Sequence, residues 1–105
     1  MQNKNFGLKS SVIKNLKAVF ESNPKIERVL IYGSRAKGNY YKGSDIDLVV
    51  IAPQMSFSEY LRLYSELEEL NIPYHIDLAK YELLDDKIKE HIDRVGLEIY
   101  KKSTS

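Results

Sequence analysis

Residues 31–50 of this 105-residue chain read IYGSRAKGNYYKGSDIDLVV, and this stretch decides how the rest of the sequence is interpreted. It joins two apolar segments through a loop that contains three glycines. Residues 26–32 (IERVLIY) and 45–51 (DIDLVVI) are predicted to be strands, because β-branched and aromatic residues favour a pleated, half-buried backbone. The far half of the second strand is apolar on both faces, which is typical of a central strand. The loop permits an antiparallel pair, and a helical turn is expected near residues 35–37.

Helices are predicted on both sides of this stretch. Apolar residues recur at spacings of three and four in residues 8–20, 56–70 and 85–95, as they do along one face of a helix. Serines are expected to cap the first two helices, at Ser10 or Ser11 and at Ser56 or Ser58. Gly96 stands where a glycine commonly ends a helix. Within the second helix, Tyr60 and Tyr64 fall on the apolar face and are interpreted as core residues.

The order of elements predicts a small α/β fold. Residues 74–79 (YHIDLA) are the third strand, which gives a mixed three-stranded sheet flanked by helices. The helix between the second and third strands would be a right-handed crossover, which makes these two strands parallel. We expect one domain over residues 1–105, with flexible tails at residues 1–7 and 101–105.

Composition excludes several classes of protein. Sixteen basic and fifteen acidic residues give a net charge of +1, which argues against binding nucleic acid by bulk charge. The chain has no cysteine, and therefore no disulfide, thiolate metal site or cysteine nucleophile. The N-terminal residues lack the apolar region of a signal peptide, and the apolar run at residues 48–52 is too short to span a bilayer. A cytoplasmic location without membrane attachment is the expectation.

Three aspartates are candidate metal ligands. Asp45 and Asp47 are two residues apart on a predicted strand, so both side chains point to one face, with Cβ atoms roughly 6–7 Å apart. Asp77 lies beside them if the third strand is parallel to the second. Carboxylates at this spacing suit Mg²⁺ or Mn²⁺, and catalytic metal pairs lie about 3.5–4 Å apart. The alternative is a strand end with solvated aspartates. His75 shares the face of Asp77, either as a ligand or base or as a partly buried, hydrogen-bonded histidine.

The glycine loop is a candidate phosphate site. Gly33 allows backbone N–H groups to approach an anion, Ser34 offers a hydroxyl, and Arg35 can bind phosphate in bidentate fashion. Gly33 and Gly38 have the spacing of a P-loop, but asparagine and tyrosine follow where that motif needs Lys and Ser or Thr. The alternative is a tight turn with a solvated arginine.

Taken together, these motifs resemble the DNA polymerase β-like nucleotidyltransferase superfamily, whose pattern is Gly-Ser, a short gap and Asp-x-Asp. The sequences GSRAKG and SDIDLVV are most similar to the minimal nucleotidyltransferase (MNT) group, which reads Gly-Ser-Arg-Ala-Arg-Gly, five variable residues, then Ser-Asp-x-Asp-Leu. The spacing here is the same, with Lys37 in place of the second arginine. The resemblance extends over most of the chain, including Asp77 and residues 96–100.

The resemblance implies a nucleotidyltransferase fold and metal-dependent transfer of AMP, or another NMP, from ATP or another NTP to a hydroxyl. The residues implied in nucleotide binding are Gly33, Ser34, Arg35 and Ser44. Asp45, Asp47 and Asp77 would bind the Mg²⁺ or Mn²⁺ ions and form the catalytic set, and Asp77 would also help to activate the acceptor hydroxyl.

The resemblance also implies a partner. Minimal members of the superfamily are often encoded beside a small helical HEPN protein, an RNase toxin that they neutralise by complex formation or by adenylylating a tyrosine. Little of this chain lies outside the expected core, so a partner protein, a homo-oligomer or an exposed surface must supply the acceptor. Our leading hypothesis is a protein adenylyltransferase that acts as the antitoxin of a HEPN toxin. The alternatives are an antitoxin that acts by contact alone and an aminoglycoside-type enzyme that modifies a small molecule.

Overall fold

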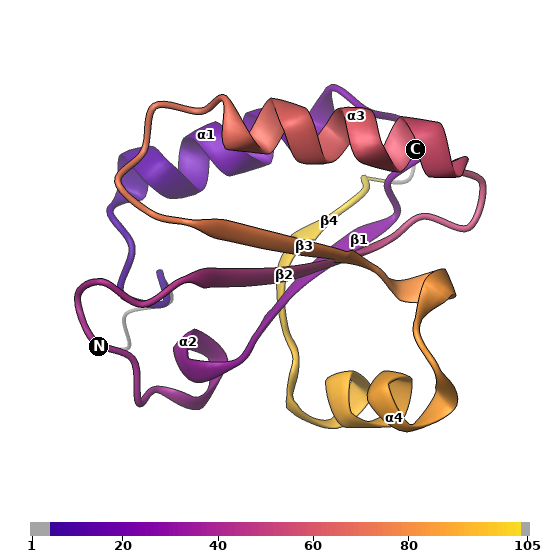
Figure 1. Cartoon of the computed structure of the whole chain (residues 1–105). Helices are drawn as coiled ribbons and strands as arrows, with labels where there is room; N and C mark the ends of the chain where they lie inside the picture. The colour runs from indigo at the N-terminus through magenta and orange to yellow at the C-terminus, as the bar shows by residue number, and fades with distance from the viewer. Residues whose placement is uncertain (1–4, 104–105) are drawn as a thin grey trace.

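The computed structural model describes residues 5–103 and shows one sheet with helices on both faces (Figure 1). Its elements, in chain order, are α1 (Ser10–Glu21), β1 (Arg28–Tyr32), α2 (Ser34–Lys37), β2 (Ile46–Ile51), α3 (Phe57–Glu68), β3 (Ile76–Lys80), the 3₁₀ turn η1 (Tyr81–Leu83), α4 (Asp86–Val95) and β4 (Leu97–Lys101). No helix in the described part of the chain is both long and apolar enough to cross a bilayer.

The sheet has four strands in the order β3-β2-β1-β4. β1 is antiparallel to β2, and β2 is parallel to β3, so both predicted pairings and the mixed sheet are confirmed. The expected number of strands was wrong, because residues 97–101 pair antiparallel with the free edge of β1. This segment, LEIYK, buries only Ile99 and shows little alternation, so its strand character depends on a pairing partner far away in the sequence.

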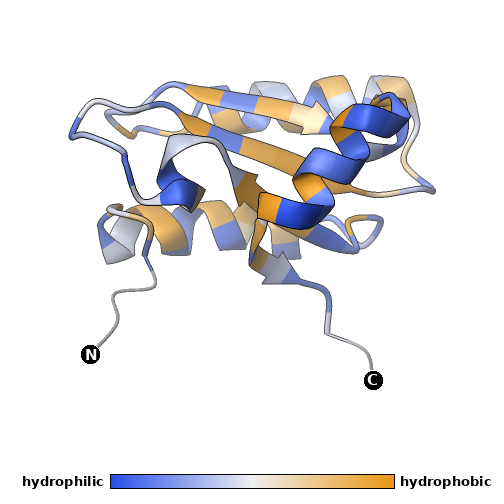
Figure 2. Cartoon of the chain, turned by 90° about the horizontal axis from the view of Figure 1, so that it is seen from below, coloured by the Kyte–Doolittle hydropathy of each residue, from blue (hydrophilic) through white to orange (hydrophobic). Residues whose placement is uncertain are grey.

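Two apolar layers enclose the sheet. α1 and α3 lie over one face, where Leu16, Phe20 and Leu48 belong to the larger core, and α4 lies over the other (Figure 1). The smaller core under α4 is built from Leu30, Val49 and Ile92. Figure 2 shows the central strands coloured as hydrophobic over most of their length, whereas α4 carries hydrophilic residues between its apolar ones. The side chains of β2 alternate between the two cores, as expected for a central strand.

The helix ends follow the sequence signals in part. α3 begins at Ser56, whose hydroxyl accepts from the Glu59 N–H while the Glu59 carboxylate accepts from the Ser56 N–H, a complete capping box. The expected serine cap of α1 was wrong, because the helix starts one residue earlier with Lys9 at the N-cap and no side-chain bond. Gly96 ends α4 in an extended conformation with φ −69°, so it does not serve as a left-handed cap.

The expected tails need correction as well. Residues 1–4 and 104–105 of those tails lie outside the described residues. Within them, Phe6 and Gly7 form a turn with positive φ that leads into α1. Lys101 belongs to β4, and the next residue, Lys102, donates its backbone N–H to the carbonyl of Glu27 at 2.8 Å. The chain that follows β4 is therefore anchored beside β1.

Candidate active site

Tyr32, Asp47 and Asp77 form a row across three adjacent strands. Asp47 is the register partner of Tyr32 in the antiparallel pair and of Asp77 in the parallel pair. Side chains of residues directly opposite one another point to the same face of a sheet. The row therefore lies on the face whose other end is covered by α4. Asp45 is exposed and stands two residues before Asp47 at the entrance to β2.

Negative charge accumulates along this row. The pKa of Asp47 is raised, first by partial burial and then by the charges of Asp77 and Asp45. The pKa of Tyr32 is raised to about 12, again by burial first and then by Asp77 and Asp47. In both residues burial is the larger cause and the neighbouring carboxylate charge adds to it, so the ionised forms are disfavoured here. A cation bound at this end of the sheet would be favoured electrostatically.

The donor set has the chemistry of a divalent-cation site, although its side chains are not grouped for one. Carboxylate oxygens are the ligands that Mg²⁺ and Mn²⁺ prefer. Among residues 5–103, no three His, Cys, Asp or Glu side chains come together in an arrangement that could hold a metal ion. The backbone register nevertheless aligns Asp47 with Asp77.

Gly33 brings the glycine turn directly against Asp47. Its φ of +73° lies in the region that L side chains rarely adopt, and a Cβ added there would stand 2.4 Å from Oδ2 of Asp47. Glycine is therefore needed here for its conformation and for the close approach. Ser34 follows as the first residue of α2, the short helical turn that the sequence predicts. The structure thus places the Gly33 backbone against Asp47, and Ser34 is the next residue in the chain.

Arg35 and Ser44 make contacts that differ from the expected nucleotide contacts. Arg35 is 3 % exposed, and its Nη1 and Nη2 donate to the carbonyls of Phe6 at 2.9 Å and Ser44 at 2.8 Å. Ser44 is buried, and its hydroxyl accepts from the N–H of Tyr41 at 2.9 Å. Both side chains therefore support the loop. His75 is exposed, so the expectation of a partly buried histidine was wrong.

Two tyrosines at the site were missed by the sequence reasoning, which interpreted Tyr64 as a core residue and gave Tyr32 no role. Tyr64 is half-buried against the core as expected, but its hydroxyl also donates to Oδ1 of Asp77 at 3.2 Å. One turn earlier, the hydroxyl of Tyr60 donates to the carbonyl of Leu78. The i, i+4 spacing of the two tyrosines was visible in the sequence. Their reach to β3 follows only from the packing of α3 on that strand.

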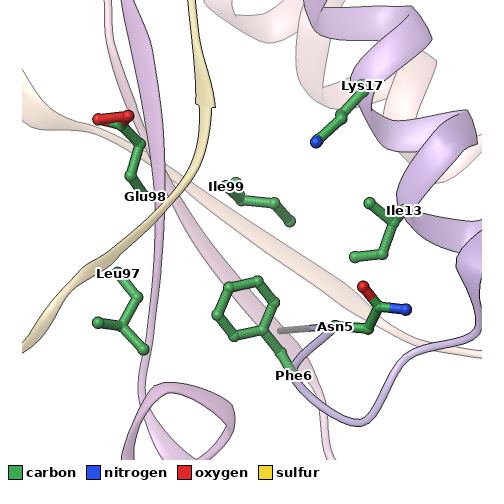
Figure 3. Close-up of a pocket in the computed structure, with 7 residues that line it drawn as sticks. All are labelled: Asn5, Phe6, Ile13, Lys17, Leu97, Glu98 and Ile99. Carbon is green, nitrogen blue, oxygen red and sulfur yellow. The ribbon is translucent and has the colours of Figure 1, made fainter. Parts of the chain in front are cut away.

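A separate groove of about 440 Å³ lies away from the carboxylates, between α1 and the edge strand β4 (Figure 3). In the close-up, the ring of Phe6 stands in this groove between Ile13 of α1 and Leu97 of β4. None of the three aspartates lines it. The groove is therefore distinct from the candidate active site.

A mixed sheet that carries Gly-Ser after one strand and Asp-x-Asp at the start of the next defines the nucleotidyltransferase class. Residues 14–105 match the family described as Polymerase beta, Nucleotidyltransferase, and the chain belongs to this family. One relative is described as a probable protein adenylyltransferase, MntA, of Haemophilus influenzae. It is 28 % identical over 96 residues, which cover 90 % of this chain and 84 % of that protein.

Solved structures share the fold. A chain of a toxin–antitoxin complex with AMP-PNP has a TM-score of 0.69 at 20 % identity, with 90 % of this chain and 75 % of that chain covered. A chain from the complex of a tri-AMPylated HEPN toxin of Shewanella oneidensis with its MNT antitoxin has a TM-score of 0.68 at 14 % identity, with 90 % and 74 % covered. These similarities confirm a nucleotidyltransferase fold.

Proposed function

We propose that this protein is a metal-dependent protein adenylyltransferase that acts as the antitoxin of a HEPN-type toxin. The observation that carries the proposal is the alignment of Asp47 with Asp77, beside the Gly33-Ser34 turn, in a chain of the nucleotidyltransferase family. The protein substrate and the antitoxin role rest on relatives: one is described as a protein adenylyltransferase, and a structural neighbour comes from a complex with an AMPylated HEPN toxin.

Each site residue has a role in this proposal. Asp45, Asp47 and Asp77 would hold Mg²⁺ or Mn²⁺, which neutralises phosphate charge and aligns the attacking oxygen when it is bound. Gly33 and Ser34 bind the triphosphate of ATP through backbone N–H groups and the serine hydroxyl. The acceptor hydroxyl oxygen forms a bond to the α-phosphorus as the bond to the leaving pyrophosphate breaks. Asp77 takes the proton from that hydroxyl.

The proposal is tested by transfer to a partner. The purified protein is incubated with labelled ATP, Mg²⁺ and a HEPN-type protein of the same genome, and the products are examined by gel and by intact mass. We expect the mass of one or more AMP groups on the partner, absent with the Asp45→Asn, Asp47→Asn double variant. A tight complex without transfer from any of the four NTPs, and full neutralisation of the toxin by that double variant, would establish an antitoxin that acts by contact alone.

A further inference from the structure

Arg35 joins its own loop to two segments that are far away in sequence, the residues before α1 and the residues before β3. Besides its bonds to the carbonyls of Phe6 and Ser44, its guanidinium lies over the rings of Tyr40 at 5.2 Å and Tyr74 at 5.0 Å. These contacts lie in the approach to α1, the loop between α2 and β2, and the approach to β3. A side chain with this set of contacts fixes how these segments are arranged around it.

We propose that Arg35 is a positioning residue, which holds the starts of β2 and β3 together so that Asp47 stays aligned with Asp77, and that it does not contact the nucleotide phosphates. The part of this inference that concerns catalysis rests on the function proposed above. The structural part concerns the folded chain alone and is tested without nucleotide.

The contacts of Arg35 lie on both sides of the junction between the two strands. The backbone N–H of Ile46 donates to the carbonyl of His75 at 2.9 Å, which is where β2 first meets β3. Ser44, whose carbonyl accepts from Arg35, is two residues before Ile46, and Tyr74 is the residue before His75. Arg35 thus contacts the chain on each side of this hydrogen bond. Loss of these contacts would weaken the pairing of β2 with β3, which aligns the carboxylates of Asp47 and Asp77.

The Arg35 side chain also stabilises a turn at Phe6 and Gly7 whose backbone conformation is energetically unfavourable. Phe6 has a φ of +56° and Gly7 one of +76°, both in the left-handed region. A Cβ on Gly7 would stand 2.2 Å from Cε1 of Tyr40, so this turn packs closely against the tyrosine that Arg35 also contacts. Positive φ at a bulky residue such as Phe6 is unfavourable unless other contacts hold it. The bond from Arg35 to the Phe6 carbonyl is one such contact.

The buried surroundings of Arg35 suit a guanidinium group and give a phosphate little access to it. A planar guanidinium can donate in two directions while its faces stack on aromatic rings, which a lysine ammonium does not do. Among residues 5–103 no carboxylate forms an ion pair with Arg35, so the aromatic rings and carbonyl dipoles stabilise its charge. Arg35 is almost fully buried, so phosphate binding by its guanidinium would require this side chain to become exposed. The buried Nε, which has no partner among the described residues, is enclosed with the rest of the group.

The experiment compares Arg35→Lys with Lys37→Gln, which changes the exposed cation of the same short helix. Amide hydrogen exchange of the nucleotide-free protein is measured at Ile46 and Ser44, and binding of ATP and of tripolyphosphate is measured by calorimetry. With Arg35→Lys we expect exchange at Ile46 to rise about tenfold or more and kcat to fall about 10²-fold, as small misplacements of reacting groups do. The Kd values for tripolyphosphate should stay within about threefold, since one threefold change is well under 1 kcal/mol. Lys37→Gln should leave exchange and kcat unchanged.

Unchanged exchange at Ile46, with tripolyphosphate binding weakened more than about tenfold, would overturn the proposal and make Arg35 a phosphate ligand. If Arg35→Lys does not fold, Tyr74→Leu takes its place, because it removes one ring contact and keeps the guanidinium. Positioning predicts faster exchange at Ile46 in this variant with tripolyphosphate binding retained, whereas a phosphate ligand predicts unchanged exchange. An inactive wild-type protein with these exchange results would refute the proposed function and leave the structural role of Arg35 intact.

Discussion

Asp47 lies directly opposite Asp77 in the parallel register of β2 and β3. Two carboxylates from separate parts of the sequence thereby share one face of the sheet. The pKa of Asp47 is raised, first by partial burial and then by the charges of Asp77 and Asp45. An arrangement that costs stability in the free protein is expected where a cation or substrate compensates for it.

Asp47→Asn should therefore stabilise the cation-free protein at neutral pH and abolish nucleotidyl transfer. Because the folded-state pKa of Asp47 is raised, ionisation of this group opposes folding, and the penalty appears as the pH rises through that pKa. The melting temperature of the Asp47→Asn variant in EDTA should exceed that of the wild type at pH 7, and the gap should narrow as the pH falls and Asp47 becomes protonated. Glu66→Gln, on the exposed side of α3, is the control. A lower melting temperature for Asp47→Asn at pH 7 would contradict the prediction.

Tyr64→Phe should alter cation binding, whereas Tyr60→Phe should not. Both tyrosines pack on β3 from α3, but only Tyr64 donates to a carboxylate of the row. Loss of either hydroxyl removes one hydrogen bond and should lower the free energy of unfolding, measured in urea, by about 1 kcal/mol. Titration with Mg²⁺, followed by calorimetry and by initial rates, should show a changed affinity for Tyr64→Phe alone. Equal Mg²⁺ titrations for the two variants would remove Tyr64 from the site.

Gly33→Ala should destabilise the protein and inactivate it. The new methyl group meets the carboxylate of Asp47, and the φ of +73° is unfavourable for alanine. Gly38→Ala is a matched control, because its φ is +86° but nothing lies within 4 Å of the added Cβ. We expect Gly38→Ala to cost about 1 kcal/mol and Gly33→Ala more than that, since backbone strain of this kind costs about 1–3 kcal/mol before any clash is added. Urea unfolding gives the free energies. Activity of Gly33→Ala equal to that of Gly38→Ala would show that close approach to Asp47 is unimportant.

Glu59→Gln should reduce stability at neutral pH but not in acid. The pKa of Glu59 is lowered to about 2, first by its bond to Lys25 and then by the Ser56 N–H, so its ionised form is favoured in the folded protein. That contribution is fully present above the unfolded-state pKa and is lost as the pH falls through the folded-state value. The difference in melting temperature between wild type and variant should be present at pH 7 and vanish toward pH 2. A difference that does not depend on pH would point to packing instead of charge.

The sequence by itself determined three of the four strands, β1, β2 and β3, and the helices that cover them. These features depend on local periodicity, because side chains alternate along a strand and recur every three or four residues along a helix. The capping box of α3 could be read in the same way, since both of its partners lie within one turn. The parallel pairing of β2 with β3 could be predicted from the right-handed crossover between them. This pairing places Asp77 beside Asp47.

Only the tertiary structure decided the fourth strand, the contacts of Arg35 and the bond from Tyr64 to Asp77. LEIYK becomes a strand because β1 has a free edge, which no local pattern in that segment reveals. Arg35 was expected at a phosphate, but its partners Phe6, Ser44 and Tyr74 are brought around it by the fold. In each case at least one deciding partner, such as Tyr74 for Arg35, is distant along the chain, and a contact of that kind is specified by packing of the whole domain and not by the neighbours of the residue.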